Sequence, residues 1–145
     1  MKTLTENYYF DTTAGSAACK IGVRLTELLL KSDKALDDVV ILCIGTDRST
    51  GDSLGPIVGY KLLNRIISDS RKLTENGITV YGTLDSPVHA INLEHVLSDI
   101  ERRHGKPFCI AVDASLGTKN HIGYVTVGTG PVSYTHLRAH ETCAD

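Results

Sequence analysis

Residues 39–56, VVILCIGTDRSTGDSLGP, join a continuous apolar segment to a loop rich in glycine, hydroxyl and aspartate residues. The apolar segment is β-branched and does not alternate with polar residues, which is typical of a strand buried on both faces of a parallel sheet. After the loop, apolar residues recur every four positions from Val58 to Ile66 and predict a helix. Ser53 suits the N-cap of this helix, and Pro56 suits its first turn. The stretch therefore predicts a strand, a loop and a helix in succession.

The rest of the chain continues this alternation of strands and helices. Apolar stripes predict one helix around residues 21–29 and another around residues 93–100. Further strands are predicted at residues 78–82, 107–114 and 121–128. The last strand alternates more, so we expect it to be antiparallel or at a sheet edge. The order predicts an α/β protein, with three α/β/α layers around a mainly parallel, twisted sheet.

Composition excludes several classes of function. The chain has 145 residues and a formal net charge of −2, so it is sized for one domain and offers no basic surface for nucleic acid. It has no apolar run long enough for a membrane span and no secretory signal pattern at its start. The four cysteines, at positions 19, 43, 109 and 143, are widely spaced, which favours reduced thiols in a cytoplasmic protein. We expect no cofactor and no metal.

Both ends of the chain depart from the pattern. The first 15 residues are polar, and we expect them to be loosely attached. Residues 132–145 have no apolar period and resemble a translated sequencing-adapter artefact, so we expect a non-native tail. A single domain would then occupy residues 1–131 and be truncated at its C-terminus. A sheet left partly uncovered would expose apolar surface, which a homo-oligomer would cover.

The glycine-rich loop lacks the residues of a phosphate site. In a P-loop the last glycine is followed by lysine and a hydroxyl residue, whereas here Asp52 follows Gly51 and supplies a negative charge. Gly45, Gly51 and Gly55 are also too widely spaced for the dinucleotide pattern GxGxxG. Nucleotide binding is therefore disfavoured.

An aspartate follows each predicted parallel strand. Asp47 and Asp52 follow the first strand, Asp85 follows the second and Asp113 the third. The carboxyl ends of parallel strands meet at one edge of the sheet, where sites form. Two carboxyls held together there cannot both ionise cheaply, so one can activate water while the other donates a hydrogen bond. Asp52 and Asp113 are the predicted pair, although an aspartate at a helix start also serves as a structural cap.

Three segments resemble a known family: IGTDRSTGDSLGP (residues 44–56), GTLDSPVHAINL (82–93) and AVDASLG (111–117). They are similar to the YyaC-type sporulation proteases, which are relatives of the spore germination endopeptidase and of hydrogenase-maturation peptidases. The resemblance implies a phosphorylase/hydrolase-like α/β/α fold and a single peptidase-like domain. It also implies hydrolysis of a protein or peptide substrate, in a sporulating cell or spore, by an aspartate pair that corresponds here to Asp52 and Asp113.

Two other functions also fit these residues. The hydrogenase-maturation relatives sense nickel with two carboxylates and a histidine, which implies a metal site of Asp52, Asp85 and His89. A catalytically silent relative would instead keep the fold and bind a peptide by strand addition along an exposed sheet edge.

The polar residues of the first loop have predicted supporting roles. Arg48 is expected to pair with Asp47 at the surface or to hold a substrate carboxylate. Ser49 and Ser53 are expected to hydrogen-bond the loop or Asp52, because no GxSxG elbow marks a serine nucleophile.

Histidines supply further candidates. His89 lies at the start of the third predicted helix, where it could act in the site or pack locally. His121 lies in a loop near Asp113 and is a similar candidate. His95 and His104 lie away from the apolar stripe of their helix, and we expect both to be solvated.

Overall fold

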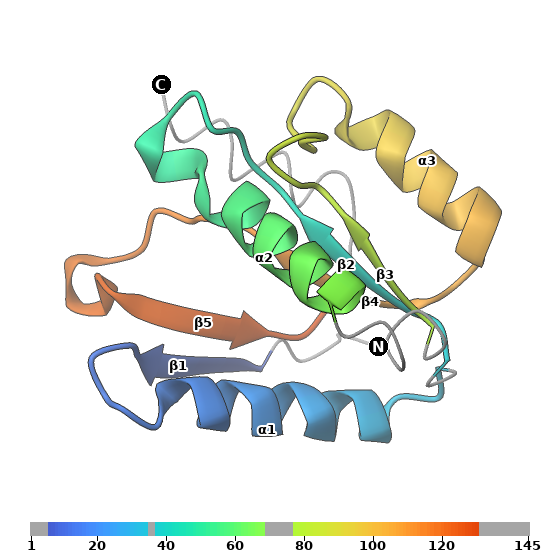
Figure 1. Cartoon of the computed structure of the whole chain (residues 1–145). Coiled ribbons are helices and arrows are strands. Elements are labelled where there is room, and N and C mark those ends of the chain that lie inside the picture. The colour runs from blue at the N-terminus through green and yellow to red at the C-terminus, as the bar shows by residue number, and fades with distance from the viewer. Residues whose placement is uncertain (1–5, 35–36, 69–76, 131–145) are drawn as a thin grey trace.

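The computed structural model describes residues 6–34, 37–68 and 77–130. The predicted α/β fold is confirmed, with three helices, a parallel three-stranded sheet and a small antiparallel pair in those residues (Figure 1). The tail predicted for residues 132–145 lies outside them. No helix in the described part of the chain is long and apolar enough to cross a membrane. The elements are β1 (Asn7–Asp11), α1 (Ala17–Lys31), β2 (Val39–Cys43), the 3₁₀ turn η1 (Thr50–Asp52), α2 (Leu54–Ser68), β3 (Ile78–Tyr81), α3 (Leu93–His104), β4 (Phe108–Val112), the 3₁₀ turn η2 (Lys119–His121) and β5 (Tyr124–Gly128).

The parallel sheet has the strand order β3-β2-β4, so the apolar segment that predicted the fold supplies its central strand. On one face of the sheet, Val40 and Leu42 join Leu93 and Ile100 of α3 in the main core cluster. On the opposite face, the side chain of Cys43 lies beneath α2. Helices on both faces explain why β2 is apolar without alternation, and they form the predicted three layers (Figure 1).

Helix α2 packs directly on backbone atoms of the sheet, and glycines permit this approach. A Cβ added at Gly55 would overlap the carbonyl of Ile44, and one added at Gly59 would overlap the carbonyl of Gly82. Gly82 itself has a φ of +87°, in the left-handed region that favours glycine. These glycines therefore serve close packing of helix on strand.

Strands β1 and β5 form a second, antiparallel sheet in which Asn7 pairs with Gly128 and Asp11 with Tyr124. The prediction that the first 15 residues are loosely attached is wrong for residues 7–11, which form β1. The strand β5 is antiparallel, as predicted, but its partner is β1 and not the parallel sheet.

The small sheet is held by its own contacts with α1. The guanidinium of Arg24 on α1 lies 3.9 Å from the ring centroid of Tyr8 on β1, a cation–π contact. The backbone N–H of Thr12 donates to the carbonyl of Gly123 (3.2 Å) and continues the pairing past the end of β1.

His104 is not solvated as predicted, because its side chain is only 15% exposed. Its Nδ1 lies 2.8 Å from Oδ1 of Asp38, and its Nε2 lies 3.1 Å from the hydroxyl of Tyr81. Burial raises the pKa of the Tyr81 hydroxyl. The ring thus connects the end of α3 with β3 and with the residue before β2.

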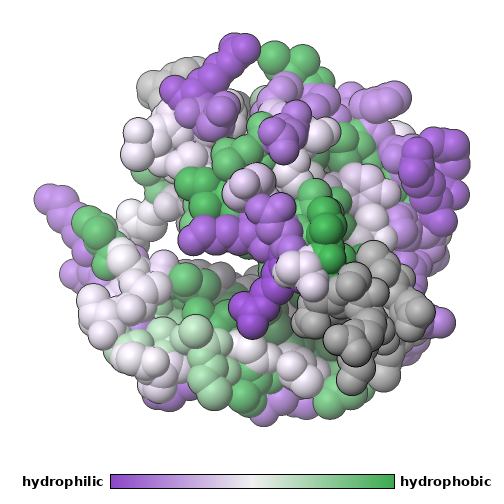
Figure 2. Space-filling view, in the orientation of Figure 1, coloured by the Kyte–Doolittle hydropathy of each residue, from purple (hydrophilic) through white to green (hydrophobic). Residues whose placement is uncertain are grey.

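Helix α2 keeps apolar side chains at the surface. Ile57, Leu63 and Ile67 are 39%, 37% and 64% exposed. Figure 2, in the same orientation as Figure 1, shows apolar side chains interspersed with polar ones on the face where α2 lies. Self-association through uncovered apolar surface stays a prediction.

The thiols give a pH-dependent prediction. Cys43 is fully buried, and desolvation raises the pKa of its thiol from 9.0 to about 11; burial also raises the pKa of Cys109. In a Cys143→Ser variant near neutral pH, a maleimide should label the exposed Cys19 quickly and Cys43 only after unfolding. Equal labelling rates at the two residues would contradict the burial of Cys43.

The same shift sets the direction of the alkaline stability change. The folded state holds the thiol proton of Cys43 more tightly than the unfolded chain does. Its contribution to the free energy of unfolding is therefore complete below pH 9.0 and is lost as the pH rises toward about 11. Urea titrations across this range, compared with a Cys43→Ala variant, measure the effect.

Candidate functional site

The loops that follow the three parallel strands meet at the carboxyl edge of the sheet. The backbone N–H of Ile44, just past β2, donates to the carbonyl of Val112 at the end of β4 (2.8 Å). The next residue, Gly45, donates to the carbonyl of Val88 in the loop between β3 and α3 (2.8 Å). Ile44 also forms an isolated parallel bridge with Val88. Backbone hydrogen bonds therefore join the loops that carry the predicted aspartates.

The backbone of Asp52 closes a turn in the first of these loops. Its carbonyl accepts the N–H of Thr46 (3.0 Å), and its own N–H donates to the carbonyl of Ser49 (3.1 Å). Gly45 permits this turn, because its φ is +146° and a Cβ there would overlap the carbonyl oxygen of Asp52. The side chain of Asp52 is exposed and lies two residues before α2. Its carboxylate is thus open to solvent near a helix N-terminus, where negative charge is stabilised.

Asp113 follows directly after β4. Val112, the last residue of that strand, pairs in parallel register with Cys43 at the end of β2. Asp113 is half-buried, in contrast to the exposed Asp52. Asp113 and the loop that carries Asp52 therefore follow adjacent strands at one edge of the sheet.

The serines of the first loop support its backbone. The hydroxyl of Ser53 donates to the carbonyl of Thr50 (2.9 Å), which confirms the predicted bond to the loop. Ser53 directly precedes α2, at the predicted N-cap position, and its carbonyl accepts the helix N–H of Ile57 (3.1 Å). Ser49 precedes η1 without a capping hydrogen bond from its side chain. Pro56 is buried in the first turn of α2, as predicted.

Asp47, Arg48 and Asp85 are all exposed. The backbone N–H of Arg48 donates to the hydroxyl of Thr46 (3.3 Å). Among the described residues, no ion pair joins the Arg48 guanidinium to Asp47, so the predicted surface pair is not formed. The other predicted role of Arg48, contact with a substrate carboxylate, stays a prediction.

Asn92, which the sequence did not single out, shapes the loop before α3. Its Oδ1 accepts the backbone N–H of His89 (2.8 Å), and its Nδ2 donates to the carbonyl of Pro87 (2.9 Å). The carbonyl of His89 accepts the N–H of Leu93 (2.9 Å). An asparagine just before a predicted helix is the sequence signal for such a turn. His89 is half-buried and held here by its backbone.

The structure does not bring the predicted metal ligands together. In the part of the chain that is described, no three His, Cys, Asp or Glu side chains lie close enough to hold a metal ion. This includes Asp52, Asp85 and His89.

His121 packs within the small sheet. Its ring stacks on Tyr9 with the centroids 4.3 Å apart, and it meets Tyr124 edge to face at 5.3 Å. Its Nδ1 lies 3.1 Å from the hydroxyl of Thr118. These contacts give His121 a packing role that joins η2 to β1 and β5.

These features define an α/β protein whose acidic loops gather at the carboxyl edge of a parallel sheet. The chain belongs to the family described as "Protein of unknown function (DUF1256)", which matches residues 13–137. It is 44% identical over 124 residues to a protein of Bacillus subtilis (strain 168) named "Uncharacterized protein YyaC". The match covers 86% of this chain and 56% of that relative, so the chain spans little more than half of the relative's length. The resemblance to the YyaC family is confirmed. No solved structure matches the chain.

Proposed function

We propose that this chain is a peptidase in which Asp52 and Asp113 together hydrolyse a peptide bond. The observation that carries the proposal is the meeting of their loops: the N–H of Ile44 bonds the carbonyl of Val112, the residue before Asp113. Sites in open α/β sheets form at this edge, outside the carboxyl ends of the strands.

The two aspartates differ in exposure, which suits two different roles. Asp52 is exposed, so its carboxylate can reach a water molecule and take a proton from it as the water attacks. Asp113 is half-buried, and in its protonated form its carboxyl would donate a hydrogen bond to the substrate carbonyl. When the peptide bond breaks, the amide nitrogen leaves as an amine and receives the proton that Asp52 took from the attacking water.

The biological setting follows from the family resemblance. The segments around Asp52, Asp85 and Asp113 resemble those of sporulation proteases, which supports a protein or peptide substrate in a sporulating cell. We place the activity in the cytoplasm of that cell or spore, in accord with the absence of any disulfide-like cysteine spacing.

The experiment is a search for new peptide N-termini. The purified full chain is incubated with unfolded proteins extracted from sporulating bacteria, and N-termini that appear with time are identified by mass spectrometry. We expect a limited set of cleavages that share a sequence preference. A set of N-termini identical to that of an extract incubated without the chain would contradict the proposal.

A peptide-binding protein without catalysis is the second candidate. It is favoured by one observation, the unpaired outer edge of β3 beside a pocket in the described residues. In that case the same peptides bind but no new N-terminus appears.

A further inference from the structure

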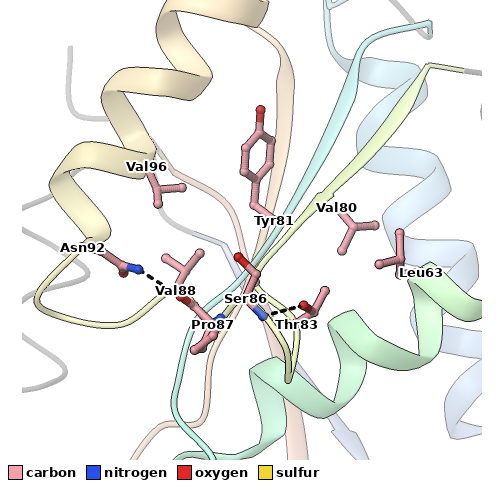
Figure 3. Close-up of a pocket in the computed structure, with 10 residues that line it drawn as sticks. Leu63, Val80, Tyr81, Thr83, Ser86, Pro87, Val88, Asn92 and Val96 are labelled. Atoms are coloured by element: carbon pink, nitrogen blue, oxygen red, sulfur yellow. Dashed lines mark hydrogen bonds between the residues drawn. The ribbon is translucent and has the colours of Figure 1, made fainter.

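A pocket of about 250 Å³ opens beside β3 at the carboxyl edge of the sheet (Figure 3). In Figure 3, Leu63 of α2 and Val80 lie on one side of it, and Asn92 and Val96 lie on the other. Its volume is below that of pockets that enclose drug-sized ligands, so it fits a single side chain better than a nucleotide. The pocket is lined by Leu63, Val80, Tyr81, Gly82, Thr83, Ser86, Pro87, Val88, Asn92 and Val96.

The lining favours an apolar occupant. None of the lining residues carries a charge at neutral pH, and the aliphatic side chains come from α2, β3, α3 and the loop after β3. The polar side chains mainly hold the wall together: Oγ1 of Thr83 accepts the N–H of Ser86 (3.1 Å), and Asn92 bonds Pro87. The walls are therefore formed in advance by internal hydrogen bonds, which lowers the entropic cost of binding.

The outer edge of β3 offers unpaired backbone groups next to this pocket. The N–H of Val39 donates to the carbonyl of Gly77 (2.9 Å), and in a parallel ladder alternate residues direct their backbone groups to the same side. Gly77 and Thr79 therefore face β2, whereas Ile78 and Val80 face away from it. Of the strands that the structure describes, none pairs with this outer side.

The pocket is continuous with the proposed catalytic edge. Val88, which lines the pocket, accepts the N–H of Gly45 at the start of the loop that carries Asp52. An extended chain along β3 would therefore be directed toward the carboxyl edge of the sheet, where the loop of Asp52 begins beside Val88. Edge strands bind extended peptides in this way, with the backbone supplying affinity and pockets for alternate side chains supplying specificity.

We propose that the pocket is a specificity subsite, which takes an apolar side chain of Leu or Phe size from an extended peptide that pairs with the Ile78 and Val80 backbone of β3. This inference rests on the proposed function in one respect, namely that the bound peptide is a substrate of the peptidase. The binding step itself stands apart from cleavage and can be tested separately.

The binding test uses the full chain with Asp113→Asn, so that a bound peptide is not consumed. The probe is a fluorescein-labelled peptide of alternating Ser and Thr with one central Leu, and the matched probe has Asp in place of the Leu. Fluorescence anisotropy should show the Leu peptide binding at least about tenfold more tightly, as expected for burial of one apolar side chain.

The variants test the position of the subsite. Leu63→Trp, added to the same background, should weaken binding of the Leu peptide about tenfold, because the indole fills the side of the pocket that Leu63 forms. The control Ile67→Trp lies one turn further along α2 at a 64% exposed position outside the pocket lining. It should leave the affinity within about twofold. Both variants should unfold at the same urea concentration as the parent.

Amide hydrogen exchange tests the pairing. With the Leu peptide bound, the N–H groups of Ile78 and Val80 should become protected, while that of Thr79, which faces β2, should change little. Equal affinity for the two peptides, no binding of either, unchanged affinity in Leu63→Trp, or no new protection at Val80 would each overturn the subsite.

Failure of the subsite and failure of the catalytic proposal give different results. If the chain binds the Leu peptide at this pocket but produces no new N-terminus, the subsite proposal stands and the aspartate mechanism is wrong. If the Leu63→Trp protein cleaves proteins with an unchanged sequence preference, the aspartate mechanism stands and the subsite proposal is wrong.

Discussion

Replacing either Asp52 or Asp113 with Asn should abolish peptide cleavage and leave the protein folded. Asn keeps the shape of the side chain and removes the group that takes or holds a proton. Loss of positioned acid–base catalysis lowers turnover by about 10² to 10⁴-fold. Cleavage rates of one peptide from the N-terminal screen measure the effect, and urea unfolding checks stability.

The double variant distinguishes joint action from two separate effects. Groups that act as a unit are strongly non-additive, so the Asp52→Asn, Asp113→Asn protein should be about as slow as the slower single variant. Asp33→Asn is the matched control, because Asp33 is exposed and lies in the connection between α1 and β2. Turnover by Asp113→Asn equal to that of Asp33→Asn would contradict the catalytic role of Asp113.

Helices and strands with their own apolar pattern were predictable, and β1 was not. The segment 39–43 has a continuous apolar sequence because it is central in the sheet and covered on both faces. Residues 7–11 become a strand only because β5 lies beside them, and the bond from Thr12 to Gly123 spans 111 residues. Local periodicity carries no signal for such a distant partner.

The site shows the same division between local and distant causes. The carboxyl ends of parallel strands lie at one edge of a sheet, and this alone predicted that the loops of Asp52 and Asp113 would meet. The prediction needs only the order and direction of the strands. Strand order did not predict the packing of His121 on Tyr9, which depends on β1. Nor did it predict the network of His104 with Asp38, 66 residues away. The position of a histidine in a local sequence pattern does not show which distant side chain it will contact in the fold.

Gly59→Ala should lower the free energy of unfolding by about 3 kcal/mol or more, although alanine is the better helix former. Gly59 lies within α2, and its added Cβ would overlap the backbone carbonyl of Gly82, which cannot rotate away as a side chain can. The helix must then move off β3, which weakens burial of the Cys43 side chain beneath it. Urea unfolding of the two proteins measures the difference.

Gly22→Ala is the matched control, because Gly22 lies within α1 and an added Cβ meets nothing within 4 Å. There the helix propensity of alanine acts alone, so the free energy of unfolding should rise by up to about 1 kcal/mol. The same substitution in two helices therefore has opposite signs, and the sign is set by whether the glycine contacts a strand. If Gly59→Ala stabilised the protein as Gly22→Ala does, α2 would not pack on β3 as closely as described. The loop of Asp52, which leads into that helix, would then lose the support that holds it at the sheet edge.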